Sequence, residues 1–77
     1  MKAAFKSRGR GGQRWHSTFE DFQQVPRVGD YIARTTSSTW VLVELVAWLP
    51  DGAEGRDCDV EIYGVEVDQA EILGNLP

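Results

Sequence analysis

Residues 40–49 read Trp-Val-Leu-Val-Glu-Leu-Val-Ala-Trp-Leu, and this stretch decides the fold. Nine of its ten residues are apolar, many of them β-branched or aromatic, as in strands covered on both faces. We therefore expect a long strand at the centre of the fold. Regular alternation would place five of these side chains on one face: Trp40, Leu42, Glu44, Val46 and Trp48. Such a face fits either core packing or the centre of an interface with a polar rim, and Glu44 would lie outward or pair with an arginine such as Arg34.

Downstream, Pro50-Asp51-Gly52 predicts a turn, because proline presets the first turn dihedral and glycine accepts a positive one. Residues 57–67 then alternate as in a half-buried strand, with Cys58, Val60 and Ile62 on one side. The opposite side carries a row of like charges, namely Asp57, Asp59 and Glu61. Residues 68–74 offer an Asp N-cap, a Glu three residues later and a terminating Gly, which predicts one helical turn.

Upstream, residues 31–33 predict a short strand, and residues 35–39 predict a polar connection to the central strand. Residues 2–7 and the glycine-rich turn at 9–12 predict a hairpin. Residues 13–22 fit two structures equally well. Trp15, Phe19 and Phe22 have the i, i+4, i+7 spacing of a helix face, whereas alternation by twos predicts a strand. Val25-Pro26 ends either element.

The length of 77 residues predicts a single small domain with a thin core. The charge of the chain is unevenly distributed. Residues 1–16 carry five Lys or Arg and no acid, whereas residues 17–77 carry three Arg against twelve Asp or Glu. These segments contribute +5 and −9, which add to the net charge of −4. An acidic body disfavours general binding to phosphates and favours a basic protein partner.

The sequence predicts neither an enzyme nor a cofactor. Cys58 and His16 come without a nucleophile turn or an oxyanion motif, and the single Cys and single His do not make a zinc site. A calcium loop starting at Asp57 would need Gly and Glu where Ile62 and Asp68 stand. We find no long apolar stretch and no secretory signal, and therefore expect a soluble, cytoplasmic protein without a membrane partner.

The pattern Pro26-Arg27-Val28-Gly29-Asp30-Tyr31-Ile32, followed by Trp40-Val41-Leu42-Val43 and Val60-Glu61-Ile62-Tyr63, resembles SH3-like barrels and is similar to short proteins of phages and bacteria. The resemblance covers residues 25–67 and implies a binding module rather than an enzyme. We expect a mainly β fold, either a small antiparallel SH3-like barrel or a highly bent sheet, with one or two short helical turns. A basic hairpin or short helix (1–24) would precede the β core (25–67), and a helical turn (68–77) would follow it.

These features predict a non-enzymatic protein-binding module for a host protein with a basic surface. The predicted contact residues are Asp57, Asp59, Glu61, Trp40, Glu44 and Trp48. The short, acidic format is similar to that of anti-CRISPR and other anti-defence proteins, so the specific expectation is a phage or mobile-element protein that inhibits a host protein. The alternative is a nucleic-acid-associated SH3-like module that uses Arg8, Arg10 and Arg14 of the basic segment.

Overall fold

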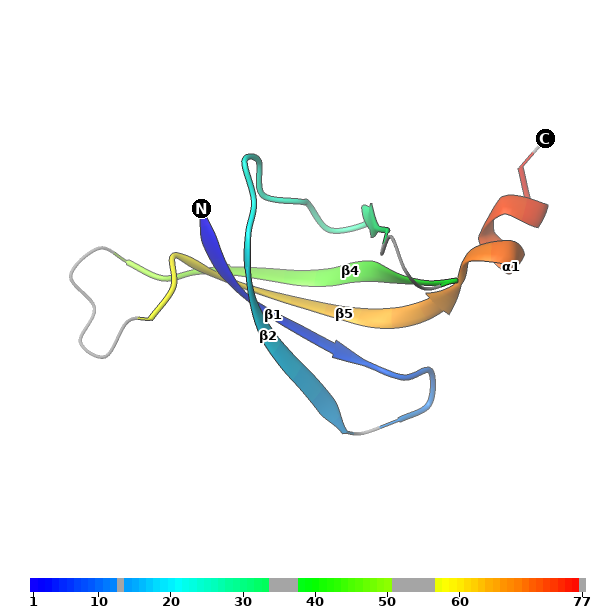
Figure 1. Ribbon diagram of the computed structural model, residues 1–77, viewed down its shortest axis with the longest axis horizontal. Helices are drawn as coiled ribbons and strands as arrows, with labels where there is room; N and C mark the ends of the chain where they lie inside the picture. The colour runs from blue at the N-terminus through cyan, green and yellow to red at the C-terminus, as the bar shows by residue number, and fades with distance from the viewer. Residues whose placement is uncertain (13, 34–37, 51–56, 77) are drawn as a thin grey trace.

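The computed structural model describes residues 1–12, 14–33, 38–50 and 57–76. These residues form five strands and one short helix, which confirms a mainly β fold (Figure 1). The elements are β1 (Lys2–Arg8), β2 (Trp15–Asp21), β3 (Tyr31–Ile32), β4 (Thr39–Trp48), β5 (Val60–Asp68) and α1 (Gln69–Gly74). The turn expected at Pro50-Asp51-Gly52, most of the 35–39 connection and Arg34 lie outside the described residues.

The strands form one mixed sheet in the order β2-β1-β5-β4-β3. The expectation of a closed antiparallel barrel is wrong in two respects. Strand β1 pairs with β5 in parallel, whereas the other three pairings are antiparallel. The sheet also stays open, because β2 and β3 lie at opposite edges. Residues 22–30 carry the chain from one edge to the other, and β5 then inserts between β1 and β4 (Figure 1).

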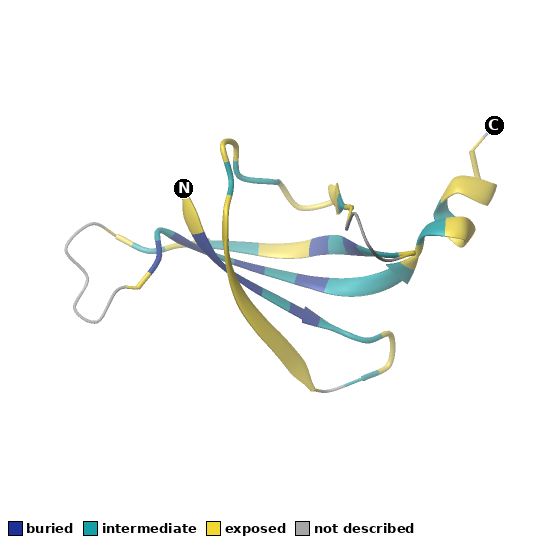
Figure 2. Ribbon diagram, viewed as in Figure 1, coloured by how far each residue is buried: buried dark blue, intermediate teal, exposed yellow. Residues whose placement is uncertain are grey.

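The hydrophobic core lies on one face of the three central strands. Each of these strands contributes two fully buried side chains, which are Ala3 and Phe5 of β1, Val60 and Ile62 of β5, and Val41 and Val43 of β4. Figure 2 shows this burial concentrated in the middle of the sheet. Phe22 and Val25 of the crossing segment pack against the core, and the Phe22 ring centroid lies 6.5 Å from that of Phe5. The crossing segment thus covers the core face.

A β-bulge interrupts the long strand β4. Val43 pairs with Gly64, and Leu45 pairs with Tyr63, the residue directly before Gly64 in the antiparallel strand β5. Two residues of β4 therefore advance the pairing by only one residue of β5, and Glu44 is the extra residue. The alternation therefore restarts, and Val46 packs against the core as Val43 does. The expectation that Val46 and Trp48 share a face with Trp40 is wrong for this reason. A strand that is apolar on both faces carries no alternation from which the bulge could be detected.

Residues 13–22 were ambiguous between helix and strand, and the structure places β2 there. Strand β2 pairs with β1 along its full length, from Trp15 opposite Arg8 to Asp21 opposite Lys2. The predicted glycine turn joins the two strands, with Gly11 at φ 74° and the Gly12 N–H donating to the Gly9 carbonyl at 2.9 Å. The hairpin supplies these residues with backbone partners, which outweighs the helical spacing of their aromatic side chains.

The turn before β3 depends on Gly29, which has φ 95°. Its N–H donates to the Val43 carbonyl at 2.9 Å, so this turn is bonded to the centre of β4. The neighbouring Asp30 carboxylate accepts the Arg27 N–H at 2.8 Å, an interaction typical of Asp in turns. The sequence-predicted glycine-aspartate turn is therefore present where it was expected.

The C-terminal end of the sheet confirms three predictions. Cys58, Val60 and Ile62 are all buried, as the alternation predicted. Asp68 caps α1, and its side chain accepts the Ala70 N–H at 2.9 Å. The helix ends at Gly74, as the terminating glycine predicted, and the cap Asn75 has an ordinary φ of −91°.

Candidate binding surfaces

The second face of the sheet, opposite the core, is the largest candidate surface, and we call it the open face. The strand registers place on it alternate side chains of all five strands. Among them are Lys2, Lys6, Arg8, Trp15, Phe19, Tyr31, Trp40, Leu42, Leu45, Glu61, Tyr63 and Val65. Four large apolar side chains of this set remain exposed, by 43% (Trp15), 58% (Phe19), 45% (Tyr31) and 53% (Leu45). No described element covers them as the crossing segment covers the core face.

Cationic side chains of β1 lie beside aromatic rings on the open face. Lys2 Nζ is 5.0 Å from the Phe19 ring centroid, and Arg8 Cζ is 5.5 Å from that of Trp15. Lys6 Nζ is 5.3 Å from the centroid of Tyr63. These distances are within the range of cation–π attraction. The open face therefore combines apolar and charged groups that lie in contact with each other.

Two of these cations are also paired with carboxylates. Lys6 Nζ donates to Glu61 Oε2 at 3.1 Å, and Arg8 donates to Glu44 Oε1 at 3.3 Å. The hydrogen bond from Lys6 to Glu61 is the main reason that the pKa of Lys6 lies above its usual 10.5. A phosphate approaching these cations would have to compete with the carboxylates. The pairing thus weakens the electrostatic case for nucleic acid on this face.

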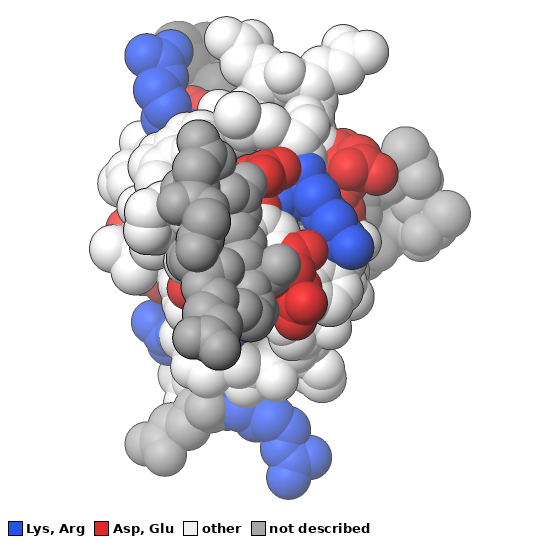
Figure 3. All heavy atoms as spheres, turned by 90° about the vertical axis from the view of Figure 1, so that its left-hand side faces the viewer, with Lys and Arg blue, Asp and Glu red and all other residues white. Residues whose placement is uncertain are grey.

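The three acids of the predicted charged row have different surroundings. Asp57 is exposed. Asp59 is half-buried and accepts the backbone N–H of Lys2 at 3.2 Å. Glu61 accepts from both Lys6 and the Tyr63 hydroxyl, the latter at 3.4 Å. Two of the three carboxylates therefore bond to β1, Glu61 from within β5 and Asp59 from the residue before it. Figure 3 shows cationic side chains among the acidic ones at this end.

The structure separates the predicted pair of tryptophans. Trp40 lies on the open face, where its ring centroid is 6.3 Å from that of Tyr31. Glu44 also reaches this side, since it contacts Arg8. Trp48 follows the bulge, so its side chain lies on the core-face side of the sheet, where it is 58% exposed. Trp40 and Glu44 therefore belong to the open face, and Trp48 belongs to a second surface.

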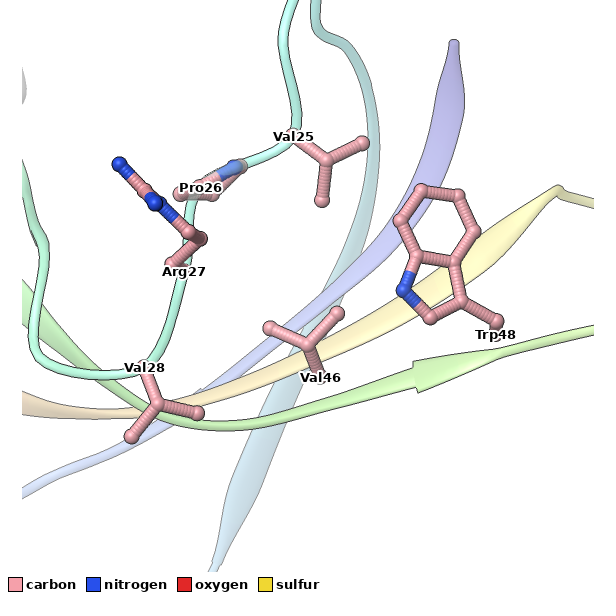
Figure 4. Close-up of a pocket in the computed structure, with 6 residues that line it drawn as sticks. All are labelled: Val25, Pro26, Arg27, Val28, Val46 and Trp48. Atoms are coloured by element: carbon pink, nitrogen blue, oxygen red, sulfur yellow. The ribbon is translucent and has the colours of Figure 1, made fainter.

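This second surface is a groove of about 170 Å³ between the crossing segment and β4. It is lined by Val25, Pro26, Arg27, Val28, Val46 and Trp48. In Figure 4 the side chains of Val25 and Val46 extend towards the Trp48 ring, whereas Arg27 points away. No sequence pattern predicts this groove, because the groove depends on the bulge that turns Val46 and Trp48 towards the crossing segment.

The three predicted arginines also have separate surroundings. Arg8 contacts Glu44 and the Trp15 ring on the open face. Arg10, in the hairpin turn, pairs with Glu71 of α1 at 3.3 Å, and both side chains are well exposed. Arg14 is exposed next to the start of β2. One of the three therefore lies among the aromatic rings, and another is paired with an acid of the C-terminal helix.

Within the described ranges, no group of three or more His, Cys, Asp or Glu side chains is placed to hold a metal ion. No helix in this part of the chain is long and apolar enough to cross a membrane. Comparisons with protein-family models, curated proteins and solved structures find no match to the chain.

Proposed function

We propose that this chain is a non-enzymatic protein-binding module and that the open face is its binding surface. The observation that carries the proposal is that four large apolar side chains, Trp15, Phe19, Tyr31 and Leu45, remain exposed on one uncovered face. Aromatic residues are enriched at the centres of protein interfaces, where they bury much area with little loss of conformational entropy. The charged residues between them supply the polar contacts that fix the orientation of a partner.

The partner that fits this chain best carries a basic surface with apolar residues at its centre. The net charge of −4 attracts a basic partner at long range. Asp57 and Asp21 are exposed, and the register places Asp21 on the open face opposite Lys2. We further propose that this partner is a host protein and that binding of the chain inhibits it.

The direct test removes apolar groups from the open face without disturbing the core. Phe19 and Leu45 are each more than half exposed, so the variant Phe19→Gln/Leu45→Gln should fold normally. The matched control, Leu73→Gln/Leu76→Gln, removes two exposed apolar side chains near the C-terminus instead. We expect the wild type and the control to capture the same protein from a host lysate, and the open-face variant to lose it. Equal capture by all three proteins would exclude the open face as the binding surface.

A second test measures the charge contribution. Replacing Asp59 and Glu61 would also break bonds inside the chain, so the informative variant is Asp21→Asn/Asp57→Asn, which changes exposed carboxylates. We expect a slower association with the captured protein at low salt, and rates that converge with those of the wild type at high salt. An unchanged association rate at low salt would rule out a basic partner surface.

One observation favours nucleic acid as a second candidate. Lys2, Lys6 and Arg8 lie beside aromatic rings on an uncovered sheet face, and such faces stack single-stranded bases in other proteins. Under this alternative, Arg8→Gln/Arg10→Gln/Arg14→Gln should lower the slope of log affinity against log salt by about 0.7 for each lost phosphate contact on single strands. Retention of the captured protein by this variant, together with loss of RNA and DNA binding, would assign the arginines to nucleic acid alone.

A further inference from the structure

Strand β2 presents a long sheet edge to solvent. It lies at the end of the strand order, and all seven of its residues are exposed. Its pairing with β1 continues without a bulge, and its sequence contains neither Lys nor Pro, the residues that commonly protect an edge. The other edge strand, β3, is only two residues long. Among the described strands, β2 is therefore the edge best able to pair with a further strand.

The hydrogen bonds at the open end of the hairpin show which backbone groups point out of this edge. The Met1 amine donates to the Phe22 carbonyl at 2.6 Å, and the Phe22 N–H donates to the Met1 carbonyl at 2.8 Å. Because bonded and non-bonded pairs alternate along an antiparallel ladder, the even-numbered residues of β2 bond to β1. Residues 15, 17, 19 and 21 therefore direct their N–H and C=O groups away from β1.

The side chains along this edge are complementary to those of an antiparallel copy. A two-fold axis through Ser17 places Trp15 opposite Phe19 of the second copy, and both lie on the open face. The same axis places Arg14 opposite Glu20 of the second copy, and each of these pairs occurs twice. Arg14 and Glu20 would form a non-bonded pair, in which opposing side chains lie closest together. No like charges oppose each other between residues 14 and 20.

We propose that two copies of this chain form a two-fold dimer in which their β2 strands pair antiparallel about Ser17. The outward N–H and C=O groups of residues 15, 17 and 19 then bond across the axis, and the two sheets become one. The two core faces lie on the same side of this sheet, so the two open faces also become continuous. The inference rests on the backbone edge of β2 and does not require a protein partner, but Trp15 and Phe19, which oppose each other across the axis, also belong to the proposed binding surface.

Charge reversal tests both the partner and the register. Arg14 and Glu20 are exposed, so Arg14→Glu and Glu20→Arg should each leave the fold intact, which circular dichroism and thermal unfolding can check. Each single variant opposes like charges twice in the dimer. We expect analytical ultracentrifugation to show a dimer for the wild type and at least about tenfold weaker association for either single variant.

Two further samples distinguish this pairing from a general effect of charge. The double variant Arg14→Glu/Glu20→Arg restores both pairs with their signs exchanged, and we expect it to dimerise like the wild type. An equimolar mixture of the two single variants should form a heterodimer, because the acidic edge of one then meets the basic edge of the other. A wild type that is monomeric at every concentration, or a dimer that neither reversal weakens, would overturn the proposal.

A cross-link tests the position of the axis. Ser17 would face Ser17 of the second copy as a bonded pair, with Cα atoms about 5.5 Å apart, a separation that a disulfide can span. We expect Ser17→Cys to oxidise to a covalent dimer much faster than the control Ser38→Cys, which places a thiol on an exposed residue next to β4. Equal rates of cross-linking for the two variants would contradict an axis at Ser17.

Discussion

At the scale of single residues, Gly29 occupies a backbone conformation that other residues adopt only with strain. A Cβ at this position would meet nothing within 4 Å, so the cost of a side chain here is conformational and not steric. We predict that Gly29→Ala lowers the free energy of unfolding by about 1 kcal/mol, because L-residues disfavour a positive φ. Urea-induced unfolding measures the difference.

The control for this prediction is Gly74→Ala. Gly74 also has open space where a Cβ would lie, but it belongs to α1 and has no positive φ. Alanine should be neutral or slightly stabilising there, since it is the better helix former. Equal destabilisation by both substitutions would contradict a special role for the Gly29 conformation.

The ion pair between Lys6 and Glu61 gives stability a pH dependence at alkaline pH. The pKa of Lys6 is raised above 10.5 in the folded chain, chiefly by its hydrogen bond to Glu61. The stabilisation by this ion pair is therefore fully present below the pKa that Lys6 has in the unfolded chain. It is lost as the pH rises through the pKa of Lys6 in the folded chain. We predict that Lys6→Met is less stable than the wild type at neutral pH and that the difference between the two proteins narrows as the pH rises beyond 10.5.

Chemical unfolding of both proteins across this pH range checks the prediction. The difference between their unfolding free energies at each pH gives the contribution of the Lys6 side chain, which includes its contact with the Tyr63 ring as well as its bond to Glu61. A difference that stays constant up to the most alkaline pH would mean that the ammonium group does not stabilise the fold through this pair.

At the scale of elements, the bulge in β4 makes a prediction that a regular strand would not. Val43 is 1% exposed in the core, whereas Leu45, two residues later, is 53% exposed on the open face. A regular strand would place both on the same face. We predict that Val43→Ala costs about 2 kcal/mol of stability and that Leu45→Ala costs less than about 0.5 kcal/mol. Thermal unfolding of the two variants compares them, and similar losses would contradict the bulge.

The elements also show what the sequence could reveal. The charged neighbours of Cys58, Val60 and Ile62 make the alternation visible, and the three side chains share a buried face as this pattern predicts. In β4 a single charged residue, Glu44, stands among apolar ones and shows no alternation, so neither the bulge nor the groove beside Trp48 could be predicted. Residues 13–22 needed their partner strand to decide between helix and strand, because their local pattern fits both.

At the scale of the whole molecule, the contacts that determine the candidate surfaces join distant parts of the sequence. Lys6 and Glu61 are 55 residues apart, and no local pattern connects them. The same holds for the parallel pairing of β1 with β5, which places aromatic residues of the hairpin beside those of the later strands. The sequence predicted several of these surface residues singly, but it could not predict which of them the sheet brings together.

The position of β1 leads to the last prediction, which concerns the segment that resembles SH3-like barrels. Residues 25–67 supply four of the six fully buried core side chains, and β1 supplies the other two, Ala3 and Phe5. Without β1, one whole edge of β5 loses its backbone partners, and Val60 and Ile62 lose their neighbours in the core. We therefore predict that a fragment of residues 25–77 does not fold cooperatively alone. The loss of two buried residues and one strand pairing exceeds the small free energy of unfolding of such a small domain.

Adding a peptide of residues 1–24 to this fragment should restore a cooperative thermal transition, measured by circular dichroism, whereas the same peptide with Phe5→Ser should not. If the fragment alone melted as sharply as the full chain and at the same temperature, the core of this protein would lie within residues 25–77, and β1 would be an accessory strand.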